Sequence, residues 1–210
     1  FEGARFTVCE VDLARHDIRI FLKNAEGTNY SRPEALPQKG LLFATNAGMF
    51  RPDYEPAGLF IQNGKWLSPL VTRRGAGNFH LEPNGVFWIA NGRAAVSTTA
   101  EFAKLKPRAQ LATQSGPMLV MMGKLHPKFD INGPSRYIRN GVGVRDSDHV
   151  VFAISQTPVS FGVFARLFRD GLSCANALYF DGSVSRLYQP AGGSVGLPGP
   201  LGPLIGVYAR

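Results

Sequence analysis

Two Asn-Gly dipeptides, Asn63-Gly64 and Asn91-Gly92, constrain the fold of this chain more than any other feature of its sequence. Asparagine and glycine tolerate the positive φ values that a type I′ turn requires at its two central positions. The first dipeptide divides residues 58–70 into two short segments rich in apolar residues, and the second divides residues 85–96 in the same way. The sequence therefore predicts two β-hairpins at these places.

Further strands are predicted by alternating or continuous apolar runs that end at turn residues. They are expected within residues 17–23, 118–122, 141–145, 149–155, 177–180, 184–188 and 204–208. Helical spacing is rarer and predicts one helix over residues 161–172. A second, short helix is predicted after Thr98 or Thr99 as N-cap, with Phe102 and Leu105 facing inward.

The overall organisation follows from these elements and from the 24 glycines and 15 prolines, which argue against a mainly helical protein. No linker or block of charge divides the chain. We therefore expect one α+β domain over residues 1–210, built on a mostly antiparallel or mixed β-sheet with few connecting helices. The least regular segment, with Gly192-Gly193 and residues 198–203, is expected to form a flexible loop near the C-terminus and over the site.

An excess of positive charge, with 23 Lys and Arg residues against 15 Asp and Glu residues, favours an anionic partner. The basic residues are scattered, and only Arg73 and Arg74 are adjacent, so we do not expect nucleic-acid binding. The sequence has no Walker A loop, no GxSxG or HExxH string and no complete dinucleotide fingerprint, so no nucleotide cofactor is expected. No apolar run is long enough to predict a membrane span.

The two cysteines, Cys9 and Cys174, lack the CxxC or Cys/His spacing of a zinc site. Two interpretations are open. The cysteines are either two buried thiols or one disulfide bridge, which would stabilise an exported protein by about 5 kcal/mol in the chain-entropy model. Because the sequence begins at Phe1 rather than at a methionine, we expect that an upstream segment has been removed.

Polar side chains and glycines gather near the ends of the predicted strands. Those that follow a strand are Asn46, Gly48, Ser115, Gly116 and Asp181, and those that precede one are Asn78, His80, Glu82, Arg136 and Arg139. Each of them alone fits an ordinary turn, a structural histidine or a solvated surface residue. Together, in a chain of positive net charge, they predict a pocket for an anionic small molecule.

Five strings of the sequence, taken in order, resemble those of the phosphodiester glycosidase family. They lie at residues 46–50, 78–87, 114–120, 139–144 and 174–185, and the resemblance is closest to bacterial members. It implies an α+β domain with a polar surface cavity that hydrolyses a sugar-1-phosphodiester. The implied substrate is a phosphate-bearing glycan of the cell envelope or of an exopolysaccharide, and the implied location is the periplasm or the exterior. No cofactor and no metal ligand are assigned.

The expected roles follow from the resemblance and from the leaving group. Asp181, Arg139 and Asn46 are expected to be catalytic, and Gly48, Ser115, Gly116, Arg136, Asn78, His80 and Glu82 to bind substrate. A phosphate group departs as an anion, so the reaction depends on arginines and backbone N–H groups more than on a strong general acid. Arg139 is expected to bind the phosphate with a forked contact. Asp181 is a nucleophile, a base for water or a ligand of a sugar hydroxyl, and His80 and Glu82 are the reserve acid and base.

Alternatives to hydrolysis remain open. A protein that binds a phosphoglycan without turnover is favoured by residues 183–185, because Ser-Val-Ser replaces glycines that follow the aspartate in many family members and restricts approach of the backbone to a ligand. A structural envelope protein without a saturable ligand is a third class. For Arg139 and Asp181, the alternative to a ligand role is a buried ion pair.

Overall fold

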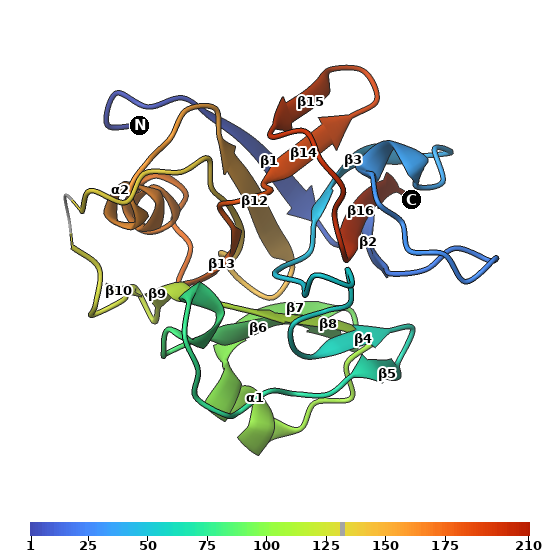
Figure 1. Ribbon diagram of the computed structural model, residues 1–210, viewed down its shortest axis with the longest axis horizontal. Coiled ribbons are helices and arrows are strands. Elements are labelled where there is room, and N and C mark those ends of the chain that lie inside the picture. Colours follow the sequence, from blue (N-terminus) through green and yellow to red (C-terminus); the bar gives the residue numbers. More distant parts are fainter. Residues whose placement is uncertain (131–132) are drawn as a thin grey trace.

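The computed structural model describes residues 1–130 and 133–210, which form three antiparallel β-sheets and a few short helices (Figure 1). Sheet A has the strand order β1 (Phe6–Asp12), β12 (His149–Ser155), β11 (Asn140–Val144), β13 (Asn176–Asp181), β9 (Met118–Met121) and β10 (Lys124–Leu125). Sheet B has the order β15 (Gly193–Gly196), β14 (Arg186–Gln189), β3 (Leu41–Asn46), β16 (Leu204–Ala209) and β2 (His16–Phe21). Sheet C has the order β5 (Lys65–Ser68), β4 (Phe60–Gln62), β8 (Leu111–Ser115), β6 (Gly85–Ala90) and β7 (Arg93–Thr98). The predicted α+β class is confirmed.

The main hydrophobic core lies where the inner faces of the three sheets meet. Phe152 of sheet A contacts one aromatic ring from each of the other sheets, with centroid distances of 5.5 Å to Phe43 and 6.0 Å to Phe87. Both ring pairs are edge-to-face, the arrangement that the aromatic quadrupole favours. The three sheets therefore pack as one unit, and the ends of their strands are held at fixed positions.

The first α-helix, α1 (Thr99–Leu105), begins with a capping box. The Thr98 hydroxyl accepts a hydrogen bond from the backbone N–H of Glu101, whose carboxylate in turn accepts one from the backbone N–H of Thr98. Phe102 is buried as predicted, but Leu105 is 63% exposed, so its predicted inward orientation is wrong. Leu105 is the last residue of the helix and does not belong to the cluster that Phe102 forms with sheet C.

The second α-helix, α2 (Phe161–Arg166), starts at the N-cap Ser160 and continues as a π turn, Leu167–Gly171. Together they occupy the predicted helical segment. Two 3₁₀ turns, Pro33–Ala35 and Asn78–His80, complete the helices of the described residues. None of these helices combines the length and the apolar character needed to cross a membrane.

The segment that the sequence predicts as a loop, 192–203, contains strand β15, which pairs with β14 at the edge of sheet B. Tyr188 lies opposite Ser194 in this hairpin, and Leu187 lies opposite Val195. The prediction of an irregular segment is therefore wrong for its first part. Glycine at both ends of the strand concealed the pattern, because glycine has low strand propensity.

Both Asn-Gly hairpins are confirmed. Asn63 and Gly64 have φ values of 51° and 75°, and Asn91 and Gly92 have φ values of 51° and 72°. These values are typical of the two central positions of a type I′ turn. The first turn joins β4 to β5 and the second joins β6 to β7, so each dipeptide fixes the register of one edge of sheet C.

Valine at position 64 or 92 is expected to destabilise the fold by about 1 to 3 kcal/mol. A Cβ added to either glycine meets no atom within 4 Å, so the cost arises from the positive φ and not from a clash. Thermal unfolding of Gly64→Val and Gly92→Val measures this cost, and the matched controls are Gly64→Asn and Gly92→Asn, because asparagine tolerates the left-handed region. Equal melting temperatures for the valine and asparagine variants would contradict this explanation.

Both cysteines are free and buried, which agrees with the first of the two interpretations. Cys9 belongs to the main core between the sheets, whereas Cys174 packs in a second cluster with α2 and the π turn. Burial raises the pKa of the Cys9 thiol to about 11 and that of the Cys174 thiol to about 12. Neither thiol is therefore a reactive nucleophile near neutral pH.

Candidate functional site

A surface cavity of about 350 Å³ lies where the end of β13 approaches the turn after β3 and the 3₁₀ turn Asn78–His80. Its lining consists of Met49, Phe50, Asn78, Asp181, Gly182, Ser183 and Val184. Three segments far apart in the sequence thus contribute to one cavity. Among the predicted site residues, Asp181 and Asn78 line it.

Asp181 is the acidic residue of this lining, and the backbone that follows it fixes its carboxylate. Its Oδ1 accepts hydrogen bonds from the N–H groups of Gly182 and Ser183, both at 2.6 Å, and from that of Val184 at 3.4 Å. Within the described residues, Oδ2 receives no hydrogen bond. Burial raises the pKa of Asp181, and the three N–H groups offset this rise only in part. One carboxylate oxygen is therefore fixed by the protein, and the other is available to a ligand.

Residues 182–184 hold the Asp181 carboxylate without the further glycines that the resemblance led us to expect after Gly182. Neither Ser183 nor Val184 has a positive φ value, so the turn does not require glycine at these positions. The backbone N–H groups converge on the Asp181 carboxylate, as described above. The Ser-Val-Ser run therefore gives no support to loss of activity.

A network of buried amides positions the backbone of Asp181. Asn140 Nδ2 donates to Asn46 Oδ1 at 2.7 Å, and Asn46 Nδ2 donates to Asn140 Oδ1 at 3.2 Å. Asn140 Oδ1 also accepts hydrogen bonds from the backbone N–H of Asp181 and from the Ser185 hydroxyl, each at 3.2 Å. Asn46 does not line the cavity, so the structure places it as a positioning residue that acts through Asn140.

The predicted residues Gly48, Ser115 and Gly116 are also buried beside the cavity rather than in its lining. A Cβ at Gly48 would lie 3.3 Å from the Cβ of Ser115, whose hydroxyl donates to the carbonyl of Phe180 at 3.1 Å. A Cβ at Gly116 would lie 3.0 Å from the carbonyl oxygen of Asn78. These residues pack together the turns that carry the lining.

Arg139 is fully buried and lies outside the lining. Its Nε donates to the carbonyl of Val159 at 2.9 Å, and its Nη1 donates to the hydroxyl of Tyr179 at 3.1 Å. Its Nη2 donates to the carbonyl and the hydroxyl of Ser135 at 3.0 and 3.2 Å. The guanidinium carbon lies 3.6 Å from the ring centroid of Phe161, a cation–π contact. A forked contact with phosphate would require these hydrogen bonds to break, so this geometry does not support the predicted role of Arg139.

The predicted alternative, a buried ion pair between Arg139 and Asp181, is wrong. No carboxylate of the described residues binds the guanidinium. Arg139 instead donates a hydrogen bond to the Tyr179 hydroxyl, near the end of β13. This hydroxyl packs so closely against Gly182 that a Cβ at position 182 would collide with it. Arg139 is thus part of the support behind the cavity.

His80 and Glu82, the reserve acid and base, do not line the cavity of Asp181. His80 Nδ1 lies 3.2 Å from the carbonyl oxygen of Arg73. Glu82 lines a separate cavity of about 440 Å³ and forms an exposed ion pair with Arg74, with 3.7 Å between Oε2 and Nε. The structure therefore separates this pair from the residues around Asp181.

Arg136 is exposed and precedes Tyr137, which is next to the cavity. The Cβ of Tyr137 would lie 3.2 Å from a Cβ at Gly182, so the two residues pack directly together. Tyr137 itself is 50% exposed. Arg136 is therefore an exposed cation directly before a residue that packs against the lining.

Several site residues were missed by the sequence analysis. The apolar part of the lining, Met49 and Phe50, lies inside a string that the analysis singled out, but apolar side chains in a turn carried no chemical signal. Phe50 also stacks on Tyr54, with 5.7 Å between the ring centroids. Asn140, which links Asn46 to Asp181, follows Arg139 directly. An amide at the start of a buried strand was the signal that could have identified it.

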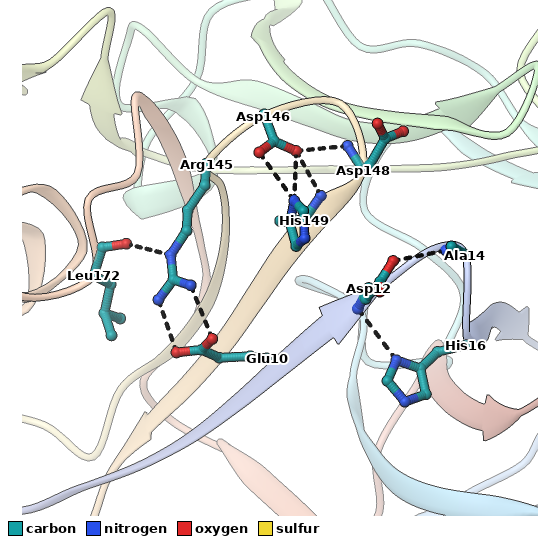
Figure 2. Close-up of polar contacts among 9 residues, drawn as sticks. All are labelled: Glu10, Asp12, Ala14, His16, Arg145, Asp146, Asp148, His149 and Leu172. Carbon is teal, nitrogen blue, oxygen red and sulfur yellow. Dashed lines mark hydrogen bonds and ion pairs between the residues drawn. The ribbon is translucent and has the colours of Figure 1, made fainter.

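A second group of charged residues surrounds the turn between β11 and β12 (Figure 2). Arg145 donates two hydrogen bonds to Glu10, at 2.7 and 2.8 Å, and one to the carbonyl of Leu172 at 2.8 Å. The carboxylate of Asp146 lies 2.9 Å from His149 Nδ1, and this contact raises the pKa of His149. These partners join β1, β12 and the segment after α2, so the group has a structural explanation.

Within residues 1–130 and 133–210, no three or more His, Cys, Asp or Glu side chains gather in an arrangement that could hold a metal ion.

Comparison with known proteins identifies a matching family, a curated relative and similar solved structures. The family model for phosphodiester glycosidases matches residues 39–195. The uncharacterized protein YigE of Escherichia coli (strain K12) is 33% identical over 180 residues, which are 83% of this chain and 70% of that protein. A solved structure of the zebrafish N-acetylglucosamine-1-phosphodiester alpha-N-acetylglucosaminidase catalytic domain, auto-inhibited by pro-peptide, is similar with a TM-score of 0.66 at 12% identity, covering 99% of this chain and 83% of that chain. A hypothetical protein from Synechocystis has a TM-score of 0.68 at 15% identity, covering 100% of this chain and 60% of that chain.

Proposed function

Because the chain belongs to the phosphodiester glycosidase family, we propose that it hydrolyses the glycosyl–phosphate bond of a sugar-1-phosphodiester in the cavity that Asp181 lines. The observation that carries this proposal is the state of the Asp181 carboxylate. Three backbone N–H groups hold Oδ1, and Oδ2 is left without a partner among the described residues at the edge of the cavity. The substrate class is a glycan that carries phosphate.

Asp181 supplies the negative charge that this reaction needs. Cleavage of a glycosidic bond develops positive charge on the anomeric carbon, and a carboxylate beside that carbon stabilises it. Ordinary glycosidases need a second carboxyl group to protonate the leaving oxygen, but a phosphate monoester departs as an anion. A lining with a single acidic residue therefore suits a sugar phosphate better than a simple glycoside.

The phosphate itself needs a cation, and Arg136 fits this role better than Arg139. The lining contains no basic residue, and the guanidinium of Arg139 is occupied behind it. Arg136 is exposed and is carried by the same short segment as Tyr137, which packs against Gly182. An exposed arginine on this segment has a long side chain whose guanidinium can bind a phosphate that projects from the cavity.

The experiment that tests the function uses an aryl ester of N-acetylglucosamine-1-phosphate in water enriched in heavy oxygen. Cleavage of the glycosyl–phosphate bond is expected to release free sugar carrying the heavy oxygen, together with an unlabelled aryl phosphate. Release of the phenol and the intact sugar phosphate would identify an ordinary phosphodiesterase and contradict the proposal. Saturable binding without any product would identify the non-catalytic glycan-binding alternative.

Arg136→Ala is expected to raise KM for the phosphodiester about fivefold to tenfold, because an exposed charge-assisted contact contributes about 1 kcal/mol. Its effect on kcat is expected to be small. Arg93→Ala is the matched control, because Arg93 is an exposed arginine at the first position of β7, in another sheet. Equal KM values for the two variants and the wild type would contradict the assignment of Arg136.

A further inference from the structure

The outer face of sheet C is covered only in part by a helix. Phe102 of α1 packs on Val86 and Ala112 in a small cluster on this face. The helix has seven residues and ends where Lys106 adopts a left-handed conformation before Pro107. The part of the face nearest β5 therefore has no helix above it (Figure 1).

The uncovered part of this face forms an open groove of about 720 Å³. Its surface is mainly apolar, and Trp66, Leu70, Phe102, Pro107 and Ala109 contribute to it. The indole of Trp66 is 57% exposed, an unusual exposure for the largest apolar side chain. The groove shares no lining residue with the cavity of Asp181, so it is a separate feature.

One side of the groove is an unpaired strand edge. β5 is the first strand of sheet C and pairs only with β4 in the described residues. Its other edge presents backbone N–H and C=O groups to the surface. Trp66 belongs to β5 and lines the groove, whereas Leu70 follows the strand and packs on the outer face of sheet C. A strand added at this edge would place alternate side chains beside Trp66, towards the groove.

The surroundings of the groove are strongly basic. Residues 60–115 contain seven basic and two acidic residues. Both acids are already engaged, Glu101 in the capping box of α1 and Glu82 with Arg74. Lys106 and Arg108 line the groove, and neither takes part in an ion pair with another described residue.

We propose that this groove binds an extended, acidic segment of a partner protein, which adds as a strand to the free edge of β5. Its apolar side chains contact Trp66 and Leu70, and its carboxylates face Lys106 and Arg108. Charge complementarity selects the acidic character, and the free strand edge selects the extended conformation. The concave shape favours an inserted segment over a flat membrane surface, which apolar side chains on a protruding loop would suit better.

The probe is a synthetic, acetylated peptide of about ten residues that alternates Glu with Val or Leu, long enough to pair with all of β5. Binding is expected to shift the fluorescence emission of Trp66 to shorter wavelength, and Trp66→Phe is expected to remove this shift. The double variant Lys106→Glu, Arg108→Glu is expected to weaken binding at least tenfold. Arg93→Glu on the far edge of sheet C is the matched control and is expected to bind the peptide within about twofold of the wild type.

Two further probes test strand addition and the membrane alternative. A peptide of the same sequence with alternate backbone amides methylated cannot pair with a strand, so equal affinity for it would overturn strand addition. Vesicles of phosphatidylglycerol test the membrane alternative: their binding through Trp66, together with failure of the acidic peptide to bind, would overturn the proposal. Asp181→Asn is expected to leave peptide binding unchanged, which separates this groove from the proposed hydrolytic site.

Discussion

Replacing Asp181 with asparagine is expected to lower kcat by about 10²- to 10⁴-fold, the range found when a group that assists the chemical step is removed. Asparagine keeps the shape of the side chain, and its Oδ1 can still accept the hydrogen bonds from the backbone of residues 182–184. The negative charge at the position of Oδ2 is lost. Product formation from the aryl sugar phosphodiester, measured at saturating substrate, gives the change in kcat.

The same variant is expected to be as stable as the wild type or more stable near neutral pH. Burial raises the pKa of Asp181 above its ordinary value of 3.8, so the folded state binds this proton more tightly than the unfolded state does. The cost of the buried charge is therefore absent below the ordinary pKa, grows as pH rises towards the raised value and is fully present above it. As pH rises through this range, the melting temperature of Asp181→Asn is expected to increase relative to that of the wild type, and thermal unfolding of both proteins measures this change.

Glu82→Gln is the matched control for Asp181→Asn. Glu82 is the other acidic residue that the sequence analysis placed in the site, but it lines a different cavity. The variant is expected to retain activity close to that of the wild type. Full activity of Asp181→Asn together with inactivity of Glu82→Gln would move the site to the second cavity and refute the proposed assignment.

The hairpins of sheet C could be predicted from the sequence because their information is local. A type I′ turn depends on two adjacent residues, and the flanking strands must then pair with each other. The inward orientation predicted for Leu105 failed for the opposite reason. Its burial depends on how far the helix overlaps sheet C, which is a property of the tertiary structure and not of helical spacing.

The candidate site was predicted in part. Asp181 was identified because a carboxylate directly after a buried strand is a local pattern, and the structure places it in the lining of a cavity. The division between lining and support could not be predicted. Asn46 and Ser115 differ from Asp181 in the direction of their side chains relative to neighbouring sheets, and for Asn46 that direction is set by contacts across as many as 140 positions of the chain. Gly48 packs beneath the lining against Ser115.

Arg139 shows most clearly that local sequence does not distinguish a ligand residue from a supporting one. An arginine beside a glycine-rich strand is a pattern typical of phosphate sites. The structure gives its guanidinium carbonyl, hydroxyl and aromatic partners instead. An arginine has five N–H donors in a fixed geometry, so it can join several segments of the chain at once. Here it joins the segment after β12 and the segment before β11 to Tyr179 on β13.

Arg139→Ala is accordingly expected to lower the free energy of unfolding by about 3 to 5 kcal/mol, because buried acceptors lose their donor and a cavity replaces the side chain. The acceptors are the carbonyls of Val159 and Ser135 and the hydroxyl of Tyr179. Denaturant unfolding followed by circular dichroism measures the change. A direct phosphate ligand would behave differently, since its removal would weaken substrate binding and leave the unfolding transition in place.

Arg139→Lys distinguishes the geometry of the side chain from its charge. Lysine keeps the positive charge, but one ammonium group cannot reach Val159, Tyr179 and Ser135 together. The lysine variant is therefore expected to lose a large share of the stability that the alanine variant loses, whereas a role based on charge alone predicts full rescue. Wild-type stability in both variants, with loss of phosphodiester binding, would return Arg139 to the role that its sequence context suggested. Substantial destabilisation of both variants would leave the phosphate contact to Arg136, at the exposed side of the same segment.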